Sequence, residues 1–245
     1  MKARDSHLIM ITEEYVKEVM AQQEGHLVIA HDFKHVNRVR NWALHIAQRE
    51  GFGDLQAVEV AALLHDIGLP YVDKESERGT HGELGAEIAG RFLSENSALP
   101  KERIEQITSA IKYHGSRPSL VADLIRTLGE KGKLTEIIRD ADNLDALGAV
   151  GLMRAFISKY FLLEYNPLNI KGDAWGLSSV EFQARFGFSS REGLAPVDTI
   201  IDQVNQQIRH YDNLHTRTAR KLGEPLVQFI KDFVLQLERE VSLTV

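Results

Sequence analysis

The chain has 245 residues, with 29 Lys and Arg against 35 Asp and Glu, a formal charge of −6, and no cysteine. Its length and its apolar content of 43% are sufficient for a large hydrophobic core. The mild negative charge argues against a nucleic-acid polymer as a partner. The lack of cysteine excludes disulfides, thiolate metal sites and a cysteine nucleophile, so any metal must be held by histidine and carboxylate side chains.

The N-terminal region carries a short apolar run at residues 8–11. Glu13 and Glu14 follow it directly and no cleavage site of small residues is present, so the run is not a signal peptide. The longest apolar stretches, such as 60–64, are far shorter than the ~20 residues that span a bilayer. We therefore expect a cytoplasmic protein without a membrane partner.

Apolar residues recur with helical spacing along most of the chain, and no segment combines strand alternation with flanking turn signals. This pattern predicts an all-α fold. Thr12 is the expected N-cap of the first helix, and a capping box that begins at Thr80 is expected to start the fourth. In chain order, helices are predicted over about 12–25, 31–51, 54–68, 80–93, 100–115 and 134–160. An irregular segment is expected at about 166–196, and helices return over about 197–245.

Histidines lie on the inward faces of two predicted helices. His35 shares a face with Val39 and Ile46, and His114 continues the stripe that contains Ile107 and Ile111. An imidazole on an apolar face needs a polar partner in the interior. These two positions are therefore candidates for a buried polar site.

The third predicted helix is apolar on nearly all sides over 57–64 and ends in His65-Asp66. Because an unpaired buried carboxylate is strongly destabilising, Asp66 must have a partner there. His81 lies in the first turn of the next helix, and a later helix carries acids in an apolar neighbourhood at Asp140, Asp142 and Asp145. Imidazoles and carboxylates on facing helices are typical of a site for Mn, Fe, Co, Ni or Zn.

Three motifs resemble those of the HD-domain superfamily of metal-dependent phosphohydrolases. In chain order they are His31-Asp32-x-x-His35-x-x-Arg38-Val39, His65-Asp66-Ile67-Gly68 and Asp140-Ala141-Asp142-Asn143-Leu144-Asp145-Ala146. The segment 216–233 is similar to the tail of small single-domain bacterial and archaeal members. The resemblance implies an HD-domain helical bundle that forms one domain over 1–245, with its metal-binding core at about 27–160.

By this resemblance, the first metal is held by His35, His65, Asp66 and Asp142. Asp142 is preferred because the last acid of the superfamily tends to read Asp-x-x-Asp-Ala, and the segment that starts at Asp142 fits this frame. Asp140 remains the alternative. His81 and His114 would complete a second metal site or contact phosphate.

Asp66 and Arg38 are the expected catalytic residues. Asp66 would also accept a proton from the attacking water, and Arg38 would offset charge on the phosphoryl oxygens. Many members have a lysine after His-Asp-Ile-Gly, whereas this chain has Leu69-Pro70. Arg38, Lys74 and Lys112 are candidates to replace that lysine.

Two further roles stay open in the sequence. His31 and Asp32 either belong to the site or only start a helix, with Asp32 as its N-cap. Asp145 either orients a metal ligand or makes an ordinary helix cap or ion pair.

The expected function is hydrolysis of a phosphate ester or phosphoanhydride in a small phosphorylated metabolite or nucleotide. One or two divalent ions of Mn, Fe, Co, Ni, Zn or Mg would be the cofactor. Two alternatives use the same scaffold, a diiron oxygenase with the same ligands and a non-catalytic ligand-binding module that would lack some of them. Substrate, metal identity and oligomeric state stay open.

Overall fold

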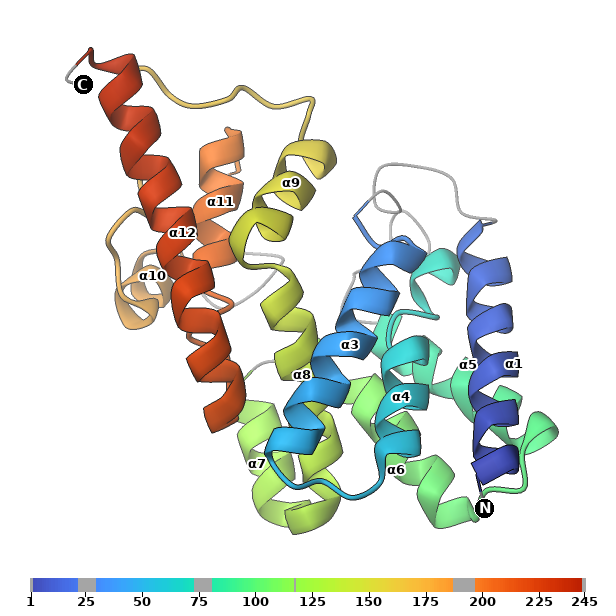
Figure 1. The fold of residues 1–245 in the computed structure, drawn as a ribbon. Helices are drawn as coiled ribbons and strands as arrows, with labels where there is room; N and C mark the ends of the chain where they lie inside the picture. Colours follow the sequence, from blue (N-terminus) through green and yellow to red (C-terminus); the bar gives the residue numbers. More distant parts are fainter. Residues whose placement is uncertain (1, 22–29, 73–80, 117, 187–196, 244–245) are drawn as a thin grey trace. The chain divides into compact units, whose positions relative to one another are not determined.

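The computed structural model describes residues 2–21, 30–72, 81–116, 118–186 and 197–243, and most of these residues are helical (Figure 1). Within these ranges the extended pairings are isolated bridges, Leu163 with Thr199 and Asn166 with Asn169. The prediction of an all-α fold is confirmed.

The chain divides into two compact units. The first contains the chain up to Asp145 together with His215–Ala219, and the second contains Ala146–Leu214 and the residues from Arg220 onward. The expectation of a single domain over 1–245 stays a prediction. None of the described helices is long and apolar enough to cross a membrane.

The first unit is built around a central buried helix, α4 (Leu55–Leu64), which contacts α1, α3, α6 and α8. Its residues from Ala57 to Leu64 are buried except Glu59, as its nearly continuous apolar sequence predicts. The other elements of this unit are α1 (Lys2–Ala21), α3 (Phe33–Arg49), the short 3-10 helix η1 (Leu69–Tyr71), α5 (His81–Asn96), α6 (Lys101–Tyr113), α7 (Pro118–Leu128), the 3-10 helix η3 (Gly129–Gly132) and α8 (Lys133–Asp145).

Two aspartates fix the starts of the helices that lead to the site. The carboxylate of Asp32 accepts the backbone N–H of His35 at 3.0 Å, and the carboxylate of Asp54 accepts that of Ala57 at 3.0 Å. Such caps satisfy amide groups that have no partner inside the helix. The cap at Asp32 places His35 in the first turn of α3.

Two expectations about helix boundaries are wrong, and one helix was not predicted. Thr12 is not an N-cap, because it is buried in the middle of α1 and its hydroxyl donates to the carbonyl of Leu8 at 2.7 Å. The helix expected over 134–160 is two helices, α8 and α9 (Gly148–Ser158), separated where Gly148 adopts a φ of 66°. The sequence reading also missed α7. Thr80, where a capping box is expected to begin, lies outside the described residues.

The second unit contains α9, α10 (Ser179–Phe186), α11 (Ile200–Ile208) and α12, a helix over Arg217–Val241 whose first turn belongs to the first unit. Helix α9 contacts α11, and Phe156 of α9 lies 5.7 Å from Phe233 of α12 between ring centroids. Thr199 and Asp202 form a capping box at the start of α11. The segment expected to be irregular contains turns and also the short helix α10.

Candidate metal centre

Histidine and aspartate side chains from five separate segments meet in the first unit. We call this set the His–Asp cluster; it consists of His31, His35, His65, Asp66, His81, His114 and Asp142. The segments are the start of α3, the end of α4, the start of α5, the end of α6 and the last turn of α8. The residues that the superfamily resemblance assigns to metal binding are thus brought together, with His31 added to them.

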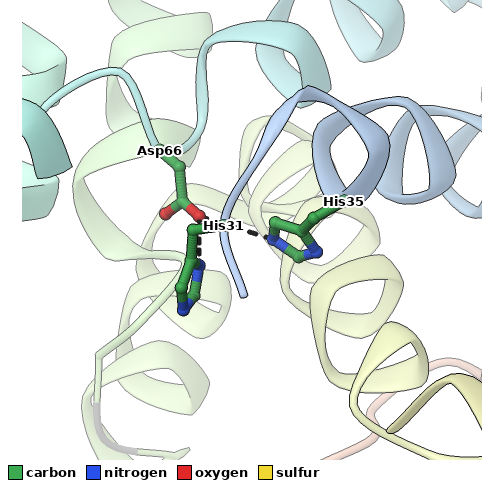
Figure 2. Close-up of side chains that lie close together, drawn as sticks. All are labelled: His31, His35 and Asp66. Atoms are coloured by element: carbon green, nitrogen blue, oxygen red, sulfur yellow. Dashed lines mark hydrogen bonds and ion pairs between the residues drawn. The ribbon is translucent and has the colours of Figure 1, made fainter. Parts of the chain in front are cut away.

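The carboxylate of Asp66 lies at the centre of the cluster and is almost fully buried. Its Oδ2 accepts a hydrogen bond from Nδ1 of His31 at 2.8 Å and lies 3.4 Å from Nε2 of His35, as Figure 2 shows. The same oxygen is 3.3 Å from Nε2 of His65. Oδ1 lies 3.4 Å from Nε2 of His114 and 3.7 Å from Nε2 of His81. The two oxygens therefore face two different groups of histidines.

Hydrogen bonds fix the orientation of three imidazole rings. Nδ1 of His65 donates to the carbonyl of Ala62 at 2.8 Å, and Nδ1 of His114 donates to the carbonyl of Ile111 at 2.7 Å. Nδ1 of His35 lies 2.7 Å from Oδ2 of Asp145. Carbonyls and carboxylates accept hydrogen bonds, so they keep a proton on Nδ1 and leave Nε2, which faces Asp66, as the nitrogen that could bind a metal.

The charges in the cluster favour ionised carboxylates. Burial raises the pKa of Asp66, but the charges of His65 and His31 outweigh it and hold the pKa well below its usual value. Burial likewise raises the pKa of Asp142, and the neighbouring His35 and His65 lower it to a net decrease. The ionised form is the one in which a carboxylate binds metal.

The spacing of the nitrogen atoms fits a divalent metal. Nε2 of His35 and Nε2 of His65 are 3.3 Å apart, and Nε2 of His81 and Nε2 of His114 are 3.2 Å apart. Two nitrogen lone pairs at this distance repel each other unless a proton or a cation lies between them. Ligand atoms bound to one ion at about 2.1 Å are separated by roughly 3.0–3.4 Å. In the described part of the chain, overlapping groups of side chains offer ligand atoms that lie within 4.8 Å of one another: His31, His35 and Asp66; His35, His65 and Asp142; and His65, Asp66 and His114.

Arg38 and Asp145 support the cluster from outside. Nε and Nη2 of Arg38 donate to the two carboxylate oxygens of Asp145 at 2.7 and 3.0 Å. Asp145 in turn contacts Nδ1 of His35, so it makes both an ion pair and a contact with a candidate metal ligand. The hydrogen bond with Asp145 raises the pKa of Arg38. Arg38 was expected to face phosphate, but two of its N–H groups, on Nε and Nη2, donate to Asp145 instead.

His31 and Asp32 have different roles in the structure. Asp32 caps α3, as one of the two readings expected. His31 contacts Asp66 across 35 residues of sequence. The available signal for His31 was its place in the His31-Asp32-x-x-His35 motif, because helix periodicity does not extend to a residue before the helix.

Lys112, another candidate to replace the superfamily lysine, is held by its neighbours. Nζ of Lys112 pairs with Glu83 at 3.2 Å and lies over the ring of Tyr113, with 5.4 Å between Nζ and the ring centroid. Lys74 lies outside the described residues.

Close backbone packing brings His81 into the cluster. A Cβ atom on Gly68 would lie 2.2 Å from the carbonyl oxygen of His81, and one on Gly82 would lie 2.5 Å from that of Lys112. Only glycine permits these approaches without movement of the backbone. The loop after Asp66, the start of α5 and the end of α6 are therefore in direct contact.

Asp140 lies apart from the histidines of the cluster. Its carboxylate accepts hydrogen bonds from the backbone N–H groups of His215 at 2.8 Å and Thr216 at 2.7 Å, and from the Thr216 hydroxyl at 2.7 Å. Burial raises the pKa of Asp140 to about 6. Asp142, two residues later, lies 3.5 Å from Nε2 of His35.

The two aspartates should respond differently to removal of their charge. We expect Asp142→Asn to weaken metal binding more than about 100-fold. This loss exceeds the roughly 10–100-fold that typically follows mutation of a residue that only orients a metal ligand. We expect Asp140→Asn to retain metal and to lower the free energy of unfolding by about 1–3 kcal/mol, because an amide N–H would face backbone donors. Metal analysis and chemical denaturation of both variants measure these effects. The reverse order would identify Asp140 as the ligand.

Comparison with known proteins identifies the family. The HD domain family model matches residues 32–147. YpgQ of Bacillus subtilis (strain 168), an uncharacterized protein, is 31% identical over 214 residues, which are 86% of this chain and 84% of YpgQ. The chain belongs to the HD-domain family. The HD-domain match begins at the cap of α3 and ends just after α8, so it contains every cluster residue except His31.

Solved HD-superfamily structures share this fold. A hydrolase of the superfamily from Bacillus thuringiensis has a TM-score of 0.64 at 23% identity, over 96% of this chain and 97% of that one. A predicted hydrolase from an uncultured Thermotogales bacterium has a TM-score of 0.57 at 26% identity, over 94% and 91%. The structure of Bacillus subtilis YpgQ in complex with ADP has a TM-score of 0.60. The structural alignment covers 97% of this chain and 96% of that one, and over this longer range the identity is 23%.

Proposed function

We propose that this HD-domain protein is a metal-dependent phosphohydrolase that acts on a small phosphorylated metabolite or nucleotide. The observation that carries the proposal is the position of Asp66, whose two oxygens face two groups of Nε2 atoms. A divalent metal held there supplies Lewis-acid polarisation of phosphoryl oxygens and an activated water nucleophile.

The donor atoms divide between two binding positions. Nε2 of His35, Nε2 of His65 and the Asp142 carboxylate lie on the side of Oδ2, and His81 and His114 lie on the side of Oδ1. These donors combine imidazoles with carboxylate, a set that suits Mn, Fe, Co, Ni or Zn better than it suits Mg. We propose that these residues would hold two ions, with Asp66 contributing a ligand to each set.

Asp66 has a second proposed role, as acceptor of the proton that the nucleophilic water loses. His31 donates to Oδ2 of Asp66 at 2.8 Å and is itself partly exposed to solvent. This contact positions the carboxylate and connects it to a group that can exchange protons with water.

The proposed substrate class follows from chemistry and from a relative. YpgQ, which is 31% identical to this chain, was solved in complex with ADP. ADP carries a phosphoanhydride and phosphate oxygens, which are the groups that a paired metal centre recognises. We therefore place nucleotides first among the candidate substrates.

Metal analysis followed by a phosphatase screen tests the proposal. The purified protein would be assayed with added Mn²⁺, Co²⁺, Ni²⁺ and Mg²⁺ against nucleotides, dinucleotides, cyclic nucleotides and sugar phosphates. We expect release of phosphate or pyrophosphate that requires metal and is abolished by chelation. Oxygen-dependent turnover with a mixed-valent iron signal would instead establish a diiron oxygenase, and tight ligand binding without turnover would establish a binding module.

A further inference from the structure

A chain of hydrogen bonds leads from Arg38 through Asp145 to His35. Oδ1 of Asp145 accepts from Nε of Arg38, and Oδ2 accepts from Nη2 of Arg38 and contacts Nδ1 of His35. His35 and Arg38 are three residues apart on α3 and so share one face of that helix. Asp145 is the last residue of α8, which packs against α3.

The burial of these three side chains determines which of their charges must be neutralised by a partner. The side chains of His35 and Asp145 are 0% and 1% exposed, whereas that of Arg38 is 33% exposed. A buried carboxylate without a cationic partner is strongly destabilising. The two-pronged contact of the guanidinium neutralises Asp145 and fixes the plane of its carboxylate. Asp145 can then hold His35 with its proton on Nδ1 and its Nε2 toward Asp66.

We propose that Arg38 is a positioning residue of the metal centre, acting through Asp145 and His35, and not a residue that contacts the substrate phosphate. This inference rests on the proposed function only in treating Nε2 of His35 as a metal ligand. Turning the Nε and Nη2 edge of Arg38 toward a phosphate would break both hydrogen bonds that Arg38 donates to the buried Asp145 carboxylate. In the structure these donors instead hold the carboxylate that contacts Nδ1 of His35.

Arg40 provides a matched control on the same helix. Its Nε donates to Glu59 at 2.8 Å, its Nη2 also pairs with Glu59, and its Nη1 donates to Glu13 at 2.8 Å. Arg40 is thus also held by carboxylates and partly buried, but its described partners do not belong to the His–Asp cluster. Arg40→Gln removes an ion-paired arginine from α3 without disturbing His35.

The first measurement is the tautomer of His35 in metal-free protein, read from long-range ¹H–¹⁵N correlation spectra. We expect wild type and Arg40→Gln to carry the proton on Nδ1. In Asp145→Asn the single amide oxygen is claimed by Arg38, so the amide N–H group faces His35 and shifts the proton to Nε2. In Arg38→Gln the Nδ1 tautomer should lose part of its population. An unchanged tautomer in both Asp145→Asn and Arg38→Gln would overturn the proposal.

The second measurement is Mn²⁺ affinity by titration calorimetry, with thermal unfolding as a check on folding. We expect Asp145→Asn and Arg38→Gln to bind Mn²⁺ about 10–100-fold more weakly, with Arg38→Lys in between and Arg40→Gln unchanged. If Arg38→Gln keeps the wild-type Mn²⁺ affinity and the wild-type His35 tautomer but raises the KM for substrate, then Arg38 is a substrate contact and the proposal is wrong. If the wild-type protein binds no Mn²⁺, the result counts against the proposed function. The tautomer of His35 in metal-free protein would still decide whether Arg38 positions His35 through Asp145.

Discussion

Replacing Asp66 by Ala is expected to abolish hydrolysis while leaving the helical circular dichroism spectrum close to that of wild type. Both groups of Nε2 atoms face this one carboxylate, so its loss removes a ligand from each proposed metal position. We expect kcat/KM to fall at least about 1,000-fold, which corresponds to roughly 4 kcal/mol of transition-state stabilisation. Metal content should fall with it.

The scaffold should survive this change. Asp66 follows the C-terminal end of α4, and the helix is held by the buried apolar side chains of Ala57–Leu64. Asp54→Ala, at the other end of α4, is the control. It removes the N-cap, which costs about 1 kcal/mol, and should leave metal content unchanged. Near-normal metal content and activity in Asp66→Ala would refute the assignment of the site.

Replacing His114 by Ala is expected to remove one of two metal equivalents and to depress kcat strongly. His114 lies on the Oδ1 side of Asp66, 3.2 Å from His81 between Nε2 atoms. The opposite side keeps His35 and His65. Two ions about 3.5–4 Å apart can stabilise both the attacking and the leaving oxygen, so loss of one should reduce turnover more than substrate binding.

Metal stoichiometry and steady-state kinetics, measured on the same preparations, check this expectation. His45→Ala is the control, because His45 lies on α3 but is not part of the His–Asp cluster. If wild type carries one metal and His114→Ala mainly raises KM, then His114 and His81 are substrate contacts.

Several features of the protein could be predicted because they depend on nearby residues. Helical periodicity, the cap at Asp32 and the apolar run of α4 are determined by side chains within a few positions of each other. The motifs around His35 and His65 gave the family, which the comparisons confirm. Local signals also misled, because Thr12 has the residue type of a cap and yet lies within α1.

The sequence by itself determined the all-α class, the family and a short list of candidate ligands. Tertiary structure alone decided which of them meet. Asp140 and Asp142 are about 200° apart around α8, so one faces residues 215–216 while the other faces His35. The Asp-x-x-Asp-Ala frame favoured Asp142, but the contact partner of each aspartate depends on how α8 packs. Arg38 likewise finds Asp145 across 107 residues of sequence. The packing of the helices determines these partners. A buried charged side chain is stable only where an opposite charge or a metal lies close to it, so its partner depends on which helices meet.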